Sequence, residues 1–219
     1  HAPISYVPVG STNDFSKSLY GNRSHSFKDI CRFITHGEPF SFDVGKFNDS
    51  YFNYVAGFGV FPSVSYTTPQ DMKNRLGYVA YVLNFLTTIP GGLTYKKHCK
   101  ITHDGIVDEG DFMLGLITNS ISVAGTQPGV IKKSSLNDGV FEALLIKANP
   151  SPIDVAEMIA AFNGNCDHCN GVLTFQFKNA TFEFEDAVPW TLDGEDGGNV
   201  QNSEISVIPE RITVFVPKK

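Results

Sequence analysis

Residues 172–184 read VLTFQFKNATFEF, and this stretch decides the fold class. Apolar and polar side chains alternate from Val172 to Phe177 and again from Thr181 to Phe184. Alternation with a period of two is typical of β-strands that bury one face, and aromatic residues suit such strands. Asn179-Ala180 separates the two runs and predicts a tight turn between them.

The same pattern extends outward in both directions. Towards the carboxy terminus, residues 211–216 alternate again, and towards the amino terminus residues 141–146 form an apolar run. That run follows Asn137-Asp138-Gly139, which is a strong hairpin-turn signal. Further upstream, Phe40 and Phe42 alternate with polar neighbours, and residues 51–55 read as one strand. Many short strands with regular turns predict a mainly β fold with a few helices, either an antiparallel β-sandwich or a strongly bent sheet.

Helical spacing appears in only a few places. Apolar residues at 27, 30 and 34 predict a helix that ends at Gly37, and Pro152 suits the first turn of a helix over 152–162. A longer stripe predicts a helix over about 70–88, where core packing is the simplest role. A short strand over 4–9 leads into Gly10-Ser11-Thr12-Asn13-Asp14, a turn whose side chains suit the start of a helix.

Composition and charge limit the function classes. The chain has 219 residues and a formal net charge of -6, which argues against nucleic acid as a partner. No apolar run reaches the roughly 18 residues that a membrane-spanning helix needs, and no signal peptide is visible. A cytoplasmic location, with peripheral membrane contact, is the expectation. Cys166 and Cys169 lie three positions apart in a loop-like stretch, where an incidental pair is the simplest interpretation.

Three polar clusters could carry chemistry. Residues 10–14 crowd hydroxyl, amide and carboxylate groups at a helix start, which suits phosphate or magnesium binding but equally suits helix capping. Asp193-Gly194-Glu195 places two acids in a tight turn, either as a general base or as a solvated hairpin turn. Asp138, with backbone carbonyls nearby, could bind magnesium or simply close a turn. The residues alone favour capping for the first cluster and a solvated hairpin turn for the second, and they do not separate the two interpretations of Asp138.

Taken in order, these pieces resemble the bacterial-type diacylglycerol and lipid kinases, to which sphingosine kinases are more distantly related. Residues 8–15, PVGSTNDF, resemble the family motif P-x-G-T-x-N-D-F. Phe42-Asp43-Val44, followed by residues 52–54 and 57–59, is similar to its next stretch, Leu136 to Gly139 resembles its D-G turn, and Asp193 to Glu195 resembles its D-G-E motif. The resemblance covers nearly the whole chain, and its specificity lies in the ordered set.

The resemblance implies a fold, a division into domains and a missing part. The family has an α/β nucleotide-binding domain with a G-G-D-G-T motif, and a second, β-rich domain that binds lipid. No G-G-D-G-T occurs here. We therefore expect residues 1–35 to be a remnant of the first domain and residues 36–219 to be the lipid-binding β-sandwich. Most of the nucleotide-binding domain is expected to be absent, which would leave this chain inactive by itself.

The resemblance also implies roles for particular residues. Glu195 matches the proton acceptor for the lipid hydroxyl, and Asp193 supports its turn. Asp14 matches an acid of the site between the domains. The implied nucleotide-binding residues are Ser11, Thr12 and Asn13, with Ser11 in the place of a family Thr. Asp138, with backbone oxygens of Ser135 and Val140, matches a structural magnesium site.

The implied activity is ATP-dependent phosphorylation of a lipid hydroxyl, with ATP and Mg²⁺ required. The expected partners are diacylglycerol or a similar lipid and a membrane surface; a homodimer is left open, and nucleic acid is not expected. One alternative is a non-catalytic lipid- or metabolite-binding sandwich. Another is a kinase of a soluble substrate, like the related NAD kinases, against which the D-G-E motif and the long β-rich region argue.

Overall fold

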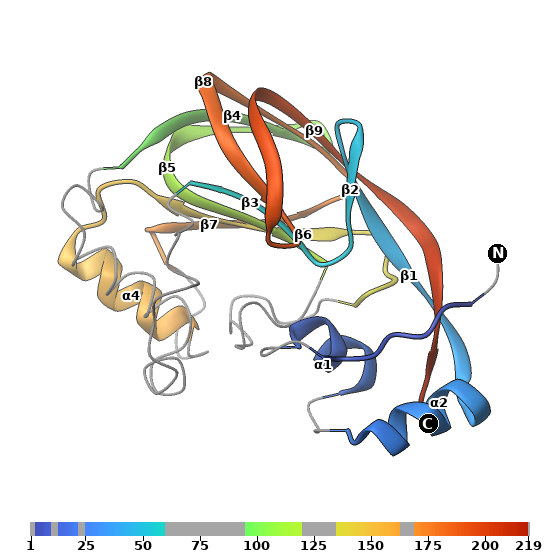
Figure 1. The fold of residues 1–219 in the computed structure, drawn as a ribbon. Coiled ribbons are helices and arrows are strands. Elements are labelled where there is room, and N and C mark those ends of the chain that lie inside the picture. The colour runs from blue at the N-terminus through green and yellow to red at the C-terminus, as the bar shows by residue number, and fades with distance from the viewer. Residues whose placement is uncertain are drawn as a thin grey trace.

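The computed structural model describes residues 3–9, 13–21, 25–59, 95–119, 135–162 and 169–218. The expected helix over 70–88 lies outside these residues. The described part is mainly β, with a few short helices (Figure 1). In chain order the elements are α1 (Asp14–Tyr20), α2 (Phe27–His36), β1 (Glu38–Phe47), β2 (Ser50–Phe52), β3 (Val55–Gly59), β4 (Lys97–His103), β5 (Ile106–Thr118), β6 (Phe141–Lys147), α4 (Pro152–Phe162), β7 (Val172–Phe177), β8 (Asn179–Leu192) and β9 (Glu195–Val216).

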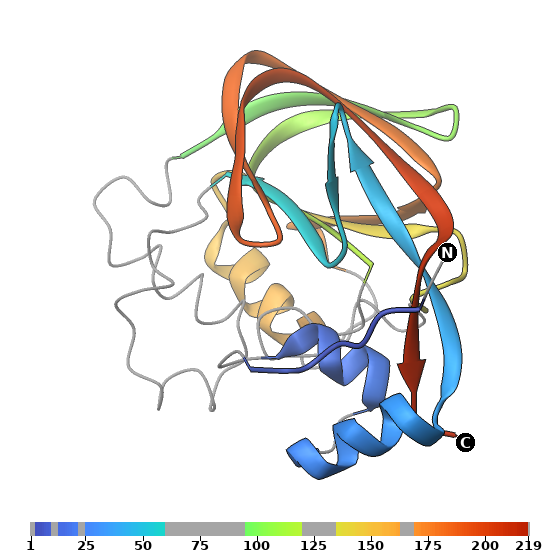
Figure 2. The ribbon, with the colours of Figure 1, turned by 45° about the vertical axis from the view of Figure 1, so that its right-hand side comes forward.

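The nine strands of the described residues belong to one antiparallel sheet, in which eight follow the order β2-β1-β9-β8-β3-β5-β6-β7. The ninth strand, β4, also lies between β5 and β8, beyond the end of β3. The sheet curls strongly, so that its two ends face one another as the layers of a sandwich (Figure 2). Phe52 of β2 and Phe141 of β6 meet across it with ring centroids 5.5 Å apart. The predicted mainly β sandwich is therefore confirmed, and one continuous sheet supplies both layers.

Aromatic side chains fill the space between the layers. The ring centroids of Phe58 and Trp190 are 5.0 Å apart, and those of Phe47 and Trp190 are 4.8 Å apart. All three side chains are almost completely buried. Tilted and edge-on contacts of this kind add to the free energy gained by removing the rings from water. The period-two Phe pattern of the sequence is thus the pattern of this core.

A second apolar cluster joins the amino-terminal segment to the outer part of the sheet. It contains Tyr20 of α1, Ile30 of α2, Phe42 of β1 and Val214 of β9. The long strand β9 spans 22 residues and carries the sheet out to α2 (Figure 1). The α2 helix begins with a capping box, in which Ser26 and Asp29 each bond the other's backbone N–H, and it stops at Gly37 as predicted.

Two predicted hairpins are wrong. Strand β7 pairs with β6 alone, whereas β8 pairs with β9, β3 and β4, so the chain turns a corner at Asn179 instead of folding back. The Asn137-Asp138-Gly139 turn precedes β6 but does not join paired strands directly, because the neighbour β5 ends at Thr118. The predicted strand over 51–55 is also split, into β2 and β3.

Candidate functional site

Three of the sequence motifs meet at one cavity of about 650 Å³. Asn13 and Phe15 reach it from the start of α1, Asn53 and Tyr54 from the bend between β2 and β3, and Asp193 from the turn between β8 and β9. Asn13 and Asp193 are 180 positions apart in the sequence. The three motifs, each a weak signal by itself, therefore line the same cavity.

The β8–β9 turn holds Asp193 in a specific position. Asp193 and Gly194 have φ angles of 53° and 92°, which places both central residues of this two-residue hairpin in the left-handed region. Asp-Gly is favoured there because it tolerates positive φ and matches the twist of the flanking strands. Asp193 and Gly194 therefore form the hairpin turn that the sequence predicted, and the same turn carries the residues for which a function was predicted.

The Asp193 carboxylate holds the bend between β2 and β3. Its Oδ2 accepts the backbone N–H of Asn53 at 2.8 Å, and its Oδ1 accepts those of Tyr54 at 2.8 Å and Val55 at 2.9 Å. The backbone N–H of Asp193 in turn donates to the Val55 carbonyl at 2.7 Å. Three donors on one carboxylate explain why residues 51–55 bend instead of continuing as one strand.

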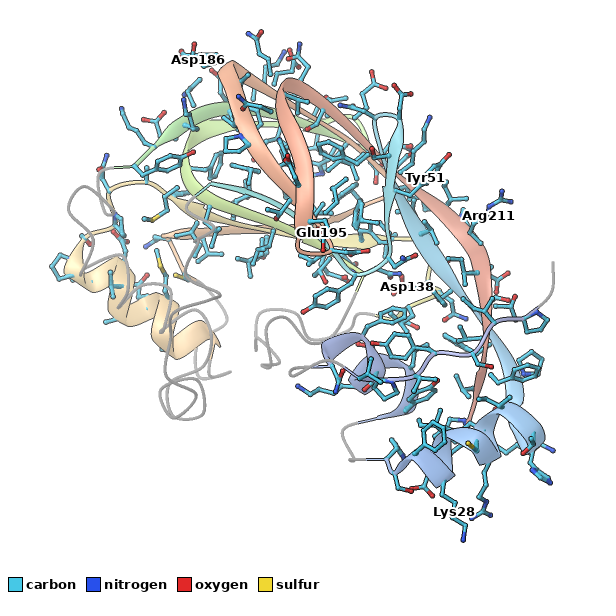
Figure 3. The ribbon with its side chains drawn as sticks, in the orientation of Figure 1. Lys28, Tyr51, Asp138, Asp186, Glu195 and Arg211 are labelled. Carbon is cyan, nitrogen blue, oxygen red and sulfur yellow. The ribbon has the colours of Figure 1, made fainter. Side chains whose placement is uncertain are left out.

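Glu195 lies at the tip of the same hairpin, opposite Leu192 (Figure 3). Its side chain is exposed and is not among the residues that line the cavity. Within the described part of the chain, its carboxylate has neither a hydrogen bond nor an ion pair. The turn therefore contains one carboxylate committed to the backbone and a second that is uncommitted.

The start of α1 differs from a simple capped helix. Asn13 occupies the N-cap position with φ 51°, but its side chain makes no capping hydrogen bond. The side-chain amide of Asn13 therefore does not cap the helix, which the sequence had left as one interpretation. The backbone of Asp14 begins the helix, but its side chain lies outside the described residues, as do Ser11 and Thr12.

The proposed metal loop is closed by Asp138. Its Oδ2 accepts the backbone N–H of Ser135 at 3.1 Å, and its Oδ1 accepts that of Val140 at 3.2 Å. The three residues are therefore neighbours, and the contacts shown are with N–H groups. Among the described residues, no group of three or more His, Cys, Asp or Glu side chains is arranged to hold a metal ion. A magnesium ion here would depend on one carboxylate, backbone carbonyls and water, a ligand set that this ion accepts.

Asp43 links this loop to the cavity, a role that the sequence did not assign although Asp43 is among the residues that carry the family resemblance. Its side chain is fully buried: Oδ2 accepts the Gly139 N–H at 2.7 Å and Oδ1 accepts the Glu210 N–H at 2.8 Å. Opposite Asp43 the register shifts, so that three β9 residues, 209–211, face this one position, and Glu210 with φ 46° brings its N–H to the carboxylate. Because Phe42 lines the cavity, Asp43 fixes the cavity wall and the Asp138 loop together. An acid among buried neighbours was the available signal.

The cysteines do not form a second site in the described residues. Burial raises the pKa of the Cys99 thiol to about 12, so this thiol stays protonated and unreactive at neutral pH. Cys169 is half-buried, while Cys166 lies outside the described residues. No described helix is long and apolar enough to cross a bilayer.

Comparisons with known proteins point in one direction. No family model matches the chain. The diacylglycerol kinase of Bacillus subtilis (strain 168) is 30% identical over 218 residues, which cover 99% of this chain and 70% of that protein. The diacylglycerol kinase of Staphylococcus carnosus (strain TM300) is 27% identical over 219 residues, covering 98% and 68%.

The fold is also that of a solved structure. A diacylglycerol kinase crystal structure from Bacillus anthracis str. Sterne matches with a TM-score of 0.68 and 21% identity, covering 94% of this chain and 66% of that one. The chain thus spans between 66% and 70% of the lengths of these three relatives.

Proposed function

The chain belongs to the diacylglycerol kinase family, and we propose that it forms the lipid-binding part of an enzyme that transfers the γ-phosphoryl group of ATP to a lipid hydroxyl. The observation that supports this most strongly is the convergence of Asn13, Asn53 and Asp193 on one cavity, with Glu195 two residues after Asp193 on the same hairpin. Phosphoryl transfer depends mainly on positioning and on charge stabilisation, which is what such a convergence provides.

We propose that Glu195 is the proton acceptor. Its uncommitted carboxylate takes the proton of the lipid hydroxyl as that oxygen bonds to the γ-phosphorus; the bond from the γ-phosphorus to the bridging oxygen breaks, and ADP leaves with the electron pair. Asp193 positions the turn and the 53–55 bend through its three backbone bonds. Its role is thus one of orientation.

The remaining roles follow from the family resemblance. We propose that Ser11, Thr12 and Asn13 contact ATP and that Asp14 helps to place Mg²⁺, which neutralises phosphate charge when bound. The loop of Ser135, Asp138 and Val140 would hold a second, structural Mg²⁺. The enzyme would work at a membrane surface, and this chain would need an upstream nucleotide-binding segment for activity.

Phosphate transfer from labelled ATP to diacylglycerol in mixed micelles tests the proposal. The chain would be compared by itself, joined to a nucleotide-binding segment, and in the joined form with Glu195→Gln. Removing a general base is expected to lower kcat by about 10² to 10⁴ with the circular dichroism spectrum unchanged. Glu185→Gln, an exposed acid on β8, is the matched control and should keep the rate.

Different results separate the alternatives. Wild-type rates in Glu195→Gln would remove Glu195 from the reaction. Lipid binding without phosphate transfer to any lipid alcohol would leave a non-catalytic binding module. Transfer to NAD in place of lipid, in the same assay, would indicate a soluble substrate.

A further inference from the structure

The place of Glu195 depends on how firmly the bend at Tyr54 is held. The Asp193 carboxylate accepts the backbone N–H of Tyr54 at 2.8 Å, and the Asp193 N–H donates to the Val55 carbonyl at 2.7 Å. Because a hydrogen bond fixes only the relative position of its two partners, these bonds hold the β8–β9 turn only as well as the bend is itself held. The support of the Tyr54 peptide therefore bears on where Glu195 lies.

Two neighbouring residues at the end of β5 hold the Tyr54 carbonyl. The Thr118 hydroxyl donates to this oxygen at 3.1 Å, and the backbone N–H of Asn119 donates to it at 3.2 Å. The Thr118 and Asn119 side chains are both fully buried. A carbonyl oxygen has two lone pairs, so it accepts both donors at once. Tyr54 is thus held on both sides, by Asp193 at its N–H and by β5 at its carbonyl.

The end of β5 is a rigid support for the bend. Thr118 pairs with Val55 of β3 on one side and with Glu142 of β6 on the other, and β5 is buried from Phe112 onward. Strands paired on both sides and buried in the core open only at free energies close to that of global unfolding. The bend is therefore tied to one of the most stable parts of the sheet.

Asn119 is anchored in turn to β1. Its side-chain Nδ2 donates to the Asp43 carbonyl at 2.8 Å, and the Leu136 carbonyl lies 3.5 Å from the same nitrogen. Hydrogen bonds between buried groups are stronger than those in water and restrict the groups that they join. A continuous set of hydrogen bonds therefore runs from the Asp193 turn through Tyr54 and Asn119 to β1.

We propose that Thr118 is a positioning residue for Glu195. Its hydroxyl holds the Tyr54 peptide on β5, this peptide holds the Asp193 carboxylate, and the carboxylate holds the turn on which Glu195 lies. Thr118 is not among the residues that line the cavity, so it acts through these groups and not on the reacting atoms. The proposal rests on the proposed function for the reaction that Glu195 serves. Because the rate of transfer depends steeply on the placement of reacting groups, loss of this hydroxyl lowers kcat more than it weakens binding.

Thr118→Val tests the proposal, because valine keeps the shape of the side chain and removes the hydroxyl, while the Asn119 N–H still satisfies the Tyr54 carbonyl. Amide hydrogen exchange at residues 53–55 should become about threefold to tenfold faster, which is the effect of one lost hydrogen bond. In the form joined to a nucleotide-binding segment, kcat should fall about tenfold or more, whereas KM should change less than about twofold.

Two further variants serve as controls. Thr118→Ser keeps a hydroxyl at the same position and should restore both the slow exchange and the kcat. Thr191→Val makes the same substitution on β8, where the hydroxyl lies 3.5 Å from the Gly57 carbonyl of β3, and it should change neither measurement. Because Thr191 precedes Asp193 by two residues, this control also tests whether any loss of a hydroxyl near the turn has the same effect.

The outcomes separate positioning from stability and from the kinase reaction. Faster exchange together with a lower kcat, both restored in Thr118→Ser, supports the proposal. Unchanged exchange at residues 53–55 in Thr118→Val overturns it, whatever the rate of phosphate transfer. Faster exchange with an unchanged kcat also overturns it, because the contact is then structural alone. If the wild-type joined protein transfers no phosphate, the proposed function fails, while faster exchange at residues 53–55 and at Glu195 still supports the positioning of the turn by Thr118.

Discussion

Asp43→Ala should cause a large loss of stability. The Asp43 side chain is fully buried, and each carboxylate oxygen accepts one backbone N–H, from Gly139 at 2.7 Å and from Glu210 at 2.8 Å. Hydrogen bonds to charged groups contribute about 1.5–3 kcal/mol each. Although the Asp43 side chain is buried, both hydrogen bonds lie in partly buried surroundings, so the lower half of that range applies. The expected loss in the free energy of unfolding is about 3–4 kcal/mol, a large share of the 5–15 kcal/mol typical of a domain.

Urea unfolding followed by fluorescence measures this loss, because the single tryptophan, Trp190, is buried in the core. Asp43→Asn is the matched control: its amide keeps one acceptor, so about half of the loss is expected. Amide hydrogen exchange should speed up at Gly139 and Glu210 before it does at core strands. A loss below about 1 kcal/mol in Asp43→Ala would refute the idea that this carboxylate joins the loop to the sheet.

Three further predictions concern other parts of the molecule. Asp138→Ala should lower the melting temperature and remove any rise that Mg²⁺ produces in wild type; identical melting curves with and without Mg²⁺ in both proteins would count against the metal loop. Hydrogen bonds that His98 makes to the carboxylates of Asp111 and then Glu109 raise the pKa of His98 above 6.5, and hydrogen bonds accepted from His98 and Lys96 lower the pKa of Asp111. The His98 contribution to stability is therefore full below its unfolded pKa and lost as pH rises through the folded pKa, while that of Asp111 is lost as pH falls; an NMR titration should show a lower His98 pKa in Asp111→Asn. Gly115→Ala would press a methyl group into the buried Phe58 ring and should cost about 1–3 kcal/mol, whereas Gly110→Ala on the same strand meets nothing closer than 3.5 Å and should be neutral in the same unfolding assay.

The sequence predicted the elements whose information is local. Alternating runs became strands β7, β8 and the end of β9, and the helix before Gly37 formed with its cap at Ser26. Periodicity succeeds here because each element buries one face against the same core. The corner at Asn179 was missed because two adjacent strands that pair with different neighbours look, in sequence, like a hairpin.

The site was visible only in part. The motifs contain Asn13, Asn53 and Asp193, but nothing in the spacing of these residues shows that the Asp193 carboxylate binds the backbone N–H groups of residues 53–55. Two extra β9 residues opposite Asp43 bring the Glu210 N–H to its carboxylate, and nothing in the alternation of β1 indicates them. Long-range hydrogen bonds and register shifts are the features that a local pattern does not encode.

The shared position of β3 and β4 has a consequence for how the protein can be re-engineered. Both strands run in the same direction beside β5; Gly59 at the end of β3 pairs with Leu114, and Lys97 at the start of β4 pairs with Phe112. The chain therefore leaves the ladder and re-enters it only two partner positions later. Strands β3 and β4 are, in topological terms, two parts of one interrupted strand, and each part has its own ladders with β5 and β8. Substitutions that weaken the pairing of one part should therefore leave the register of the other part unchanged.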